Sequence, residues 1–128
     1  DVELQKRCCL RLVELGDMSH CLTLARIFRD DMELETAVGF FEKAIAYEEE
    51  HVLFATKNDV SKLKTELLTL QKLLLLNPDP LKRLESIYAN YSRFARLAAL
   101  KLGKLYYCGE EVAKDYELAA YWYSRIGD

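Results

Sequence analysis

The chain contains too little proline and glycine for a fold built from many tight turns. Its 128 residues include only 2 Pro and 5 Gly, whereas an all-β protein needs turn residues every few positions. Leu, Ala, Glu and Lys dominate instead, and these residues favour helix. At 51% hydrophobic residues the chain can bury a substantial core. We therefore predict an all-α fold, and the length is that of a single domain covering 1–128.

The chain also lacks the usual features of membrane and nucleic-acid-binding proteins. No apolar run reaches the roughly 18 residues that a transmembrane helix requires. The formal net charge is −3, whereas nucleic-acid binding generally requires a basic surface. We expect neither membrane insertion nor a nucleic-acid partner.

The 2 His and 4 Cys form no clear catalytic or metal-binding set. His20 and Cys21 are neighbours on a predicted helix and diverge by about 100°, so they do not make a nucleophile–base pair. Together with Cys8 and Cys9 they form the one candidate zinc cluster, but the short C-x₂-C spacing is missing. No phosphate-binding glycine motif is present. We expect no catalytic residue, no metal and no cofactor, and we do not predict an enzyme.

The cysteines are interpreted as small buried hydrophobic residues in a reducing compartment. A Cys8–Cys21 disulfide is the alternative. A cytoplasmic location is favoured on this basis. The chain opens with Asp1 and not Met, so we also consider a processed N-terminus, which would be compatible with a periplasmic or secreted protein.

Apolar periodicity predicts about seven helices. They cover approximately 2–15, 18–29, 31–56, 60–76, 80–90, 92–108 and 115–126. In the first, Leu4, Cys8, Leu12 and Leu15 form the expected buried stripe. Asp30 and Glu33 have the spacing of a capping box that opens the third helix.

A break at 77–80 separates the fourth helix from the fifth. Asp79 is expected to cap the fifth helix, with Pro80 in its first turn. The fourth helix, 60–76, is unusually rich in leucine. Two interpretations stay open for it: a central core helix covered on more than one side, or a face for a missing repeat or a second chain, including a second copy of this one.

Two segments carry the same arrangement of small, apolar and aromatic residues. The earlier set has the offsets of the tetratricopeptide pattern and comprises Leu24, Ala25, Phe28, Ala37, Phe41 and Ala44. The segment resembles that repeat in a degenerate form, because Cys21 replaces its tryptophan and Glu49 its closing proline. The later set comprises Leu102, Gly103, Tyr106, Ala119 and Tyr123. With the loop 108–116, which ends in Lys-Asp-Tyr, this segment resembles the Sel-one-like repeat.

The resemblance divides the chain into a degenerate repeat at about 16–50, a divergent helical insert at about 51–91 and a repeat at about 92–128. Gly16-Asp17 precedes the first copy, and Gly127-Asp128 closes the second in the same role. We expect from this that the chain is a fragment that ends between repeats of a longer protein. The resemblance implies an α-solenoid of antiparallel helix pairs, a tetratricopeptide-like superhelix of about seven helices. Most tyrosines are expected to fill its core.

In such folds the first helix of each pair lines a concave inner wall. By resemblance, the wall here comprises Leu22, Arg26, Arg29, Leu97, Leu100, Lys104 and Tyr107. Leucine together with cations suits an acidic and apolar peptide, and residues 82–104 hold six cations against Glu85 alone. In the alternative, the leucines pack on neighbouring helices and the cations are solvated.

The resulting hypothesis is a non-catalytic scaffold or adaptor that presents a concave helical groove to a protein or peptide. The alternative hypothesis is a specific inhibitor, such as an immunity protein or antitoxin, that binds one toxin or enzyme. Binding through the divergent segment, outside the groove, would favour the inhibitor.

Overall fold

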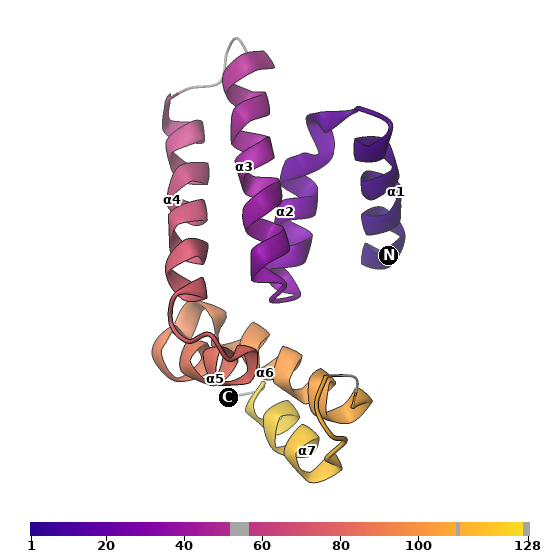
Figure 1. Ribbon diagram of the computed structural model, residues 1–128, viewed down its shortest axis with the longest axis vertical. Helices are drawn as coiled ribbons and strands as arrows, with labels where there is room; N and C mark the ends of the chain where they lie inside the picture. Colours follow the sequence, from indigo (N-terminus) through magenta and orange to yellow (C-terminus); the bar gives the residue numbers. More distant parts are fainter. Residues whose placement is uncertain (52–56, 110, 127–128) are drawn as a thin grey trace. The chain divides into compact units, whose positions relative to one another are not determined.

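The computed structural model describes residues 1–51, 57–109 and 111–126 (Figure 1). These residues contain seven α-helices, one short 3₁₀ helix and no strand, which confirms the all-α prediction. In chain order the elements are α1 (Val2–Glu14), η1 (Met18–His20), α2 (Cys21–Asp30), α3 (Leu34–His51), α4 (Lys57–Leu74), α5 (Pro80–Asn90), α6 (Ser92–Cys108) and α7 (Tyr116–Arg125).

The predicted boundaries agree best in the second half of the chain. The helices expected at 80–90 and 92–108 are α5 and α6, whereas the helix expected at 18–29 is divided into η1 and α2. The expected continuation of the third helix over 52–56 lies outside the described residues, as does the closing Gly127-Asp128. The chain divides into two compact units, Asp1–Lys72 and Leu73–Asp128, which we call unit 1 and unit 2. The single-domain organisation stays a prediction.

Aspartate side chains start several of the helices. Asp1, Asp79 and Asp115 accept hydrogen bonds from the backbone N–H of Glu3 (2.9 Å), Leu81 (3.0 Å) and Leu118 (3.1 Å). Each cap satisfies a backbone donor that has no partner inside its helix. The predicted cap of α5 by Asp79, with Pro80 in the first turn, is confirmed.

The predicted capping box of Asp30 and Glu33 is wrong. Asp30 is the last residue of α2, and the chain turns after it through Met32 at a φ of 59°. The N–H of Glu33 donates to the carbonyl of Phe28 (2.9 Å), and the N–H of Met32 donates to the carbonyl of Arg29 (3.0 Å). These two bonds form the helix-ending motif that usually has glycine at the left-handed position.

In unit 1, α2 and α3 form a tightly packed helix pair. Its buried residues include most positions of the earlier repeat copy, with exposed fractions of 0–3%; they are Leu24, Ala25, Ala37, Phe41 and Ala44. The remaining position, Phe28, is half-buried. α1 packs against α2 and η1.

The stripe predicted for α1 is wrong. Leu4 and Leu15 are 60% and 66% exposed, Cys8 is exposed as well, and Cys9 is buried. The buried face of α1 is therefore the one that includes Cys9. The expectation that all the cysteines are buried is also wrong, because Cys8 and Cys108 are exposed.

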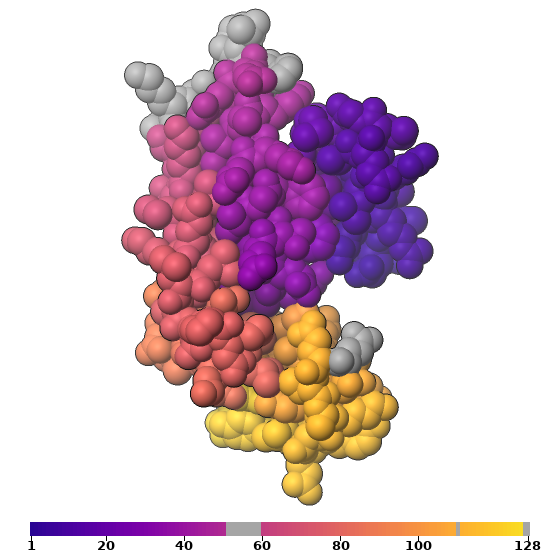
Figure 2. Space-filling model, viewed as in Figure 1, coloured from indigo at the N-terminus to yellow at the C-terminus, as the bar shows by residue number. Residues whose placement is uncertain are grey.

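The leucine-rich α4 buries one stripe of its surface. Leu63, Leu70 and Leu73 are at most 7% exposed, whereas Leu68 on the same helix is 51% exposed. Within unit 1, Lys64 pairs with Glu49 of α3 at 3.1 Å. Side chains fill the space between the ribbons of α3 and α4 (Figure 2). The expectation that α4 is covered on more than one side does not hold at Leu68.

In unit 2, α6 packs against both α5 and α7. The face of α6 that makes these contacts is rich in small residues: Ala98, Ala99 and Gly103 are buried together with Leu102. Across the crossing, Ala119 of α7 is 2% exposed. Trp122 of α7 meets the Tyr88 ring of α5 edge-on, with the ring centroids 5.2 Å apart. Small residues at the crossing allow the helix axes to approach closely.

Gly103→Leu is expected to destabilise unit 2 by about 1–3 kcal/mol through overpacking. A Cβ at this position would lie 2.8 Å from a ring carbon of Tyr123, so the ring has to move. Urea unfolding followed by the fluorescence of Trp122, the one tryptophan in the chain, measures this change in unit 2.

Gly39→Leu in α3 is the matched control. A Cβ at Gly39 meets nothing within 4 Å, so the helix propensity of leucine should stabilise α3 by about 0.5–1 kcal/mol. Circular dichroism measures that change. Equal stability of the Gly103→Leu variant and the wild-type protein would show that this close approach does not constrain the fold.

Candidate functional site

In unit 2, the predicted wall residues follow one side of α6. Leu97 and Leu100 are half-buried, Lys104 is exposed, and Tyr107 is 57% exposed. Both leucines lose part of their exposure, and the alternative in which they pack on neighbouring helices stays a prediction. Lys104 and Tyr107 lie one turn apart, so they share a face of the helix.

Tyr107 is not an isolated surface residue. Its ring centroid lies 5.6 Å from that of Tyr116, and the rings are tilted by 49°. Tyr116 is 63% exposed. We call Leu100, Lys104, Tyr107 and Tyr116 the aromatic surface of unit 2. The expectation that most tyrosines fill the core is wrong for these two, and also for Tyr121 and Tyr123, which are 45% and 37% exposed.

The turn between α6 and α7 explains how the two rings meet. α6 ends at Cys108 and is capped by Gly109, which has a φ of 69° and donates its N–H to the carbonyl of Leu105 (3.0 Å). The N–H of Asp115 then donates to the carbonyl of Tyr106 (3.0 Å). This second bond returns the chain to the last turn of α6, so that α7 begins with Tyr116 beside Tyr107. Tyr106 itself is half-buried, and this burial raises its pKa.

In unit 1, the predicted wall residues Leu22, Arg26 and Arg29 have different environments. Leu22 is half-buried and Arg26 is exposed. The Arg29 side chain is only 17% exposed, and its guanidinium lies 3.4 Å from the carboxylate of Glu66 in α4 and 3.3 Å from that of Asp30. Arg29 therefore links α2 to α4. The seven predicted wall residues fall in two units, so the two groups have to be tested separately.

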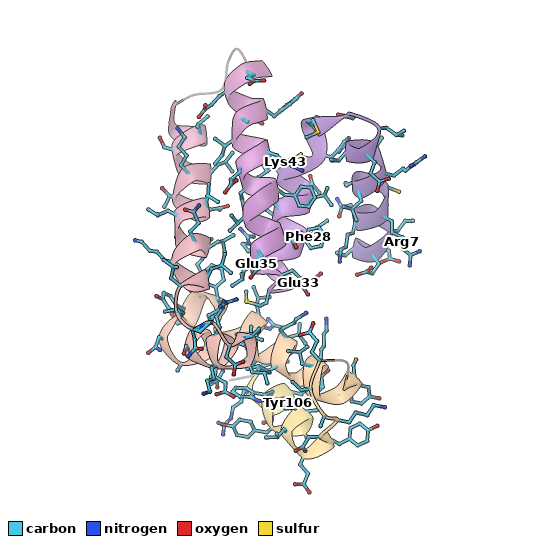
Figure 3. The ribbon with its side chains drawn as sticks, in the orientation of Figure 1. Arg7, Phe28, Glu33, Glu35, Lys43 and Tyr106 are labelled. Atoms are coloured by element: carbon cyan, nitrogen blue, oxygen red, sulfur yellow. The ribbon has the colours of Figure 1, made fainter. Side chains whose placement is uncertain are left out.

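A cation–aromatic cluster in unit 1 was not predicted from the sequence. The rings of Phe28 and Phe40 stack with a centroid distance of 5.6 Å. Lys6 lies 4.6 Å from the Phe28 centroid, and Lys43 lies 5.4 Å from the Phe40 centroid. Figure 3 labels Phe28 and Lys43. Lys6 also lies 3.6 Å from the carboxylate of Asp31. Each cation–aromatic contact contributes about 0.5–1 kcal/mol at exposed sites. The Lys6–Phe28 contact connects α1 to α2, and the Phe28–Phe40 stack connects α2 to α3.

The residues considered for nucleophilic or metal chemistry do not come together in the described part of the chain. His20 lies beside Asp17, with 3.5 Å between Nε2 and Oδ2. Cys21 is fully buried, and the loss of solvation raises the pKa of its thiol. Among the described residues, no group of three or more His, Cys, Asp or Glu is placed to hold a metal ion. The side chain of His51 lies outside the described residues.

No described helix combines the length and the hydrophobicity needed to span a bilayer. Comparison with known proteins found no matching family model, no matching curated protein and no matching solved structure. The resemblance to the two repeat families therefore rests on the residues quoted above and stays a prediction.

The thiols are expected to react in two classes. Cys8 and Cys108 are exposed and should react quickly with Ellman's reagent, whereas Cys9 and Cys21 should react only as the protein unfolds. The raised pKa of Cys21 leaves less thiolate, which is the reactive form, at neutral pH. The number of fast thiols, measured from the absorbance of the released dye, should fall by one in each of Cys8→Ser and Cys108→Ser. Four fast thiols in the native protein would contradict the burial of Cys9 and Cys21.

Proposed function

We propose that the chain is a non-catalytic helical-repeat module that binds a protein or peptide partner through the aromatic surface of unit 2. In this proposal the helix pairs continue one another as an α-solenoid of the tetratricopeptide-like kind. The exposed Tyr107–Tyr116 pair beside Lys104 is the observation that carries the proposal.

The packing pattern supports a repeat architecture. Within unit 1, α2 packs on α1 and α3; within unit 2, α6 packs on α5 and α7. Contacts between successive elements are typical of solenoids, in which each element packs mainly on its neighbours. The small residues at the α2–α3 and α6–α7 crossings agree with the pattern that the resemblance implies. Such proteins commonly act by offering a preformed surface.

The aromatic surface has the chemistry of a binding site. Aromatic residues are enriched at the energetic centres of protein interfaces, because they bury a large area with little loss of side-chain freedom. The contact between Tyr107 and Tyr116 already restricts both rings. Lys104 adds a positive charge, and Leu100 adds partly exposed apolar area. An acidic and apolar peptide complements this combination.

Lys104→Glu is expected to weaken partner binding about tenfold or more, because it replaces attraction with repulsion toward an acidic partner. Helicity should not change, since Lys104 is exposed. Partners captured from cells by the wild-type protein are identified by mass spectrometry, and their affinity for each variant is then measured by titration.

Lys82→Glu is the control, because Lys82 is also exposed and lies on α5, outside the aromatic surface. It makes the same change in net charge and should leave affinity within about twofold. A partner that binds both variants as tightly as the wild-type protein does not use this surface. Arg26→Glu tests the unit 1 residues in the same way.

Exposed leucines favour a second candidate function, the inhibitor that binds one toxin or enzyme. Leu68 is 51% exposed on α4, and Leu75 and Leu76 just after it are 85% and 37% exposed. A second copy of this chain is another candidate partner that would cover the same leucines.

Hydrogen exchange of the complex separates these functions. Protection on α6 and at the start of α7 supports the adaptor, whereas protection confined to α4 and the residues after it supports the inhibitor. Light scattering of the protein alone tests self-association. A monomer excludes the second copy.

A further inference from the structure

Unit 2 contains a cavity that is distinct from the aromatic surface. It has a volume of about 490 Å³ and lies among the end of α5, the start of α6 and the end of α7. This volume is within the range of about 300–1,000 Å³ typical of ligand sites. All of its lining residues belong to unit 2, so the cavity does not depend on how the two units are arranged.

Two arginines from different helices line this cavity. Arg96 is exposed on α6, and Arg125 is the last residue of α7. The guanidinium carbon of Arg125 lies 4.7 Å from the ring centroid of Tyr121, and its Nε atom is shielded from solvent. Tyr121 therefore helps to position this guanidinium. The described residues that line the cavity include no carboxylate.

The two arginines, and not the helix ends, give the cavity its charge. α5 and α7 end and α6 begins beside this cavity, so two negative helix-dipole ends and one positive end lie here. Each end is equivalent to about half an elementary charge, so the three ends together leave about half a negative charge, which is less than the positive charge of a guanidinium. The charged groups in the described lining are the guanidinium groups of Arg96 and Arg125, and the side-chain amide of Asn90 and the hydroxyl of Ser92 are neutral hydrogen-bonding groups.

We propose that this cavity binds an oxyanion, either a carboxylate or a phosphate group, on a side chain of the partner peptide. Arginine is the residue best suited to such groups, because its planar guanidinium donates two parallel hydrogen bonds to them. Tyr88 and Ala95 provide apolar wall for the rest of the side chain. The assignment to a peptide rests on the proposed function, whereas binding of a free anion does not.

The test is a titration of the full chain with inorganic phosphate at constant ionic strength, followed by backbone amide chemical shifts. Saturable shifts are expected at Asn90, Ser92 and Arg96. Arg96→Gln should weaken the affinity about tenfold, since one of two charge-assisted contacts is lost. Because Arg96 is exposed, the variant should fold, and unchanged Trp122 fluorescence verifies this.

Lys82→Gln removes one positive charge from α5 of the same unit, away from the cavity lining, and should keep the affinity within about twofold.

Separate titrations with phosphotyrosine and N-acetylglutamate identify the chemical group that the cavity prefers. Tighter binding of phosphotyrosine assigns a phosphate group, and tighter binding of N-acetylglutamate assigns a carboxylate. Shifts that do not saturate, or equal affinities for wild-type protein and Arg96→Gln, would overturn the site. If phosphate binds as expected but Lys104→Glu leaves partner binding unchanged, the oxyanion site stands and the aromatic-surface proposal fails.

Discussion

The close approach of helix backbones beside small residues is the constraint on which the rest of the fold depends. At the α6–α7 crossing, the ring of Tyr123 occupies the space that a side chain at Gly103 would need. Ala98 and Ala99 keep the same face of α6 free of bulk, and both are fully buried. With this space taken by the Tyr123 ring, other large aromatic groups have to lie at the edges of the crossing. The exposure of Tyr107 and Tyr116 is consistent with this arrangement.

The turns that bring the helices together rely on left-handed residues, only some of which are recognisable in the sequence. Gly16 and Gly109 have φ values of 99° and 69°, and glycine adopts such values without a steric cost. Met32 has a φ of 59° in an equivalent turn. Its side chain is 6% exposed, so burial offsets the cost of roughly 1–2 kcal/mol for a left-handed residue that is not glycine.

The sequence predicts most of the helices but few of the contacts between them. Pro80 and Gly109 mark helix ends, and the boundaries of α5 and α6 agree with those expected. The resemblance to the tetratricopeptide pattern also places Leu24 and Ala25 at positions where helices cross, and both are fully buried. It cannot show that Phe28 stacks on Phe40, because that contact depends on how α2 and α3 are oriented. The cavity between Arg96 and Arg125 was not predictable for the same reason.

The charge distribution along α6 connects its structure with the proposed binding. Arg93 lies in the first turn and Arg96 in the next, whereas no acidic residue occupies the first turn. A cation in the first turn opposes the macrodipole, at a cost of about 0.3–1 kcal/mol. The contact of Arg93 with the Phe94 ring, 5.1 Å from its centroid, offsets part of this cost. An anion held at Arg96 would offset more, so binding an oxyanion should also stabilise the helix that carries the aromatic surface.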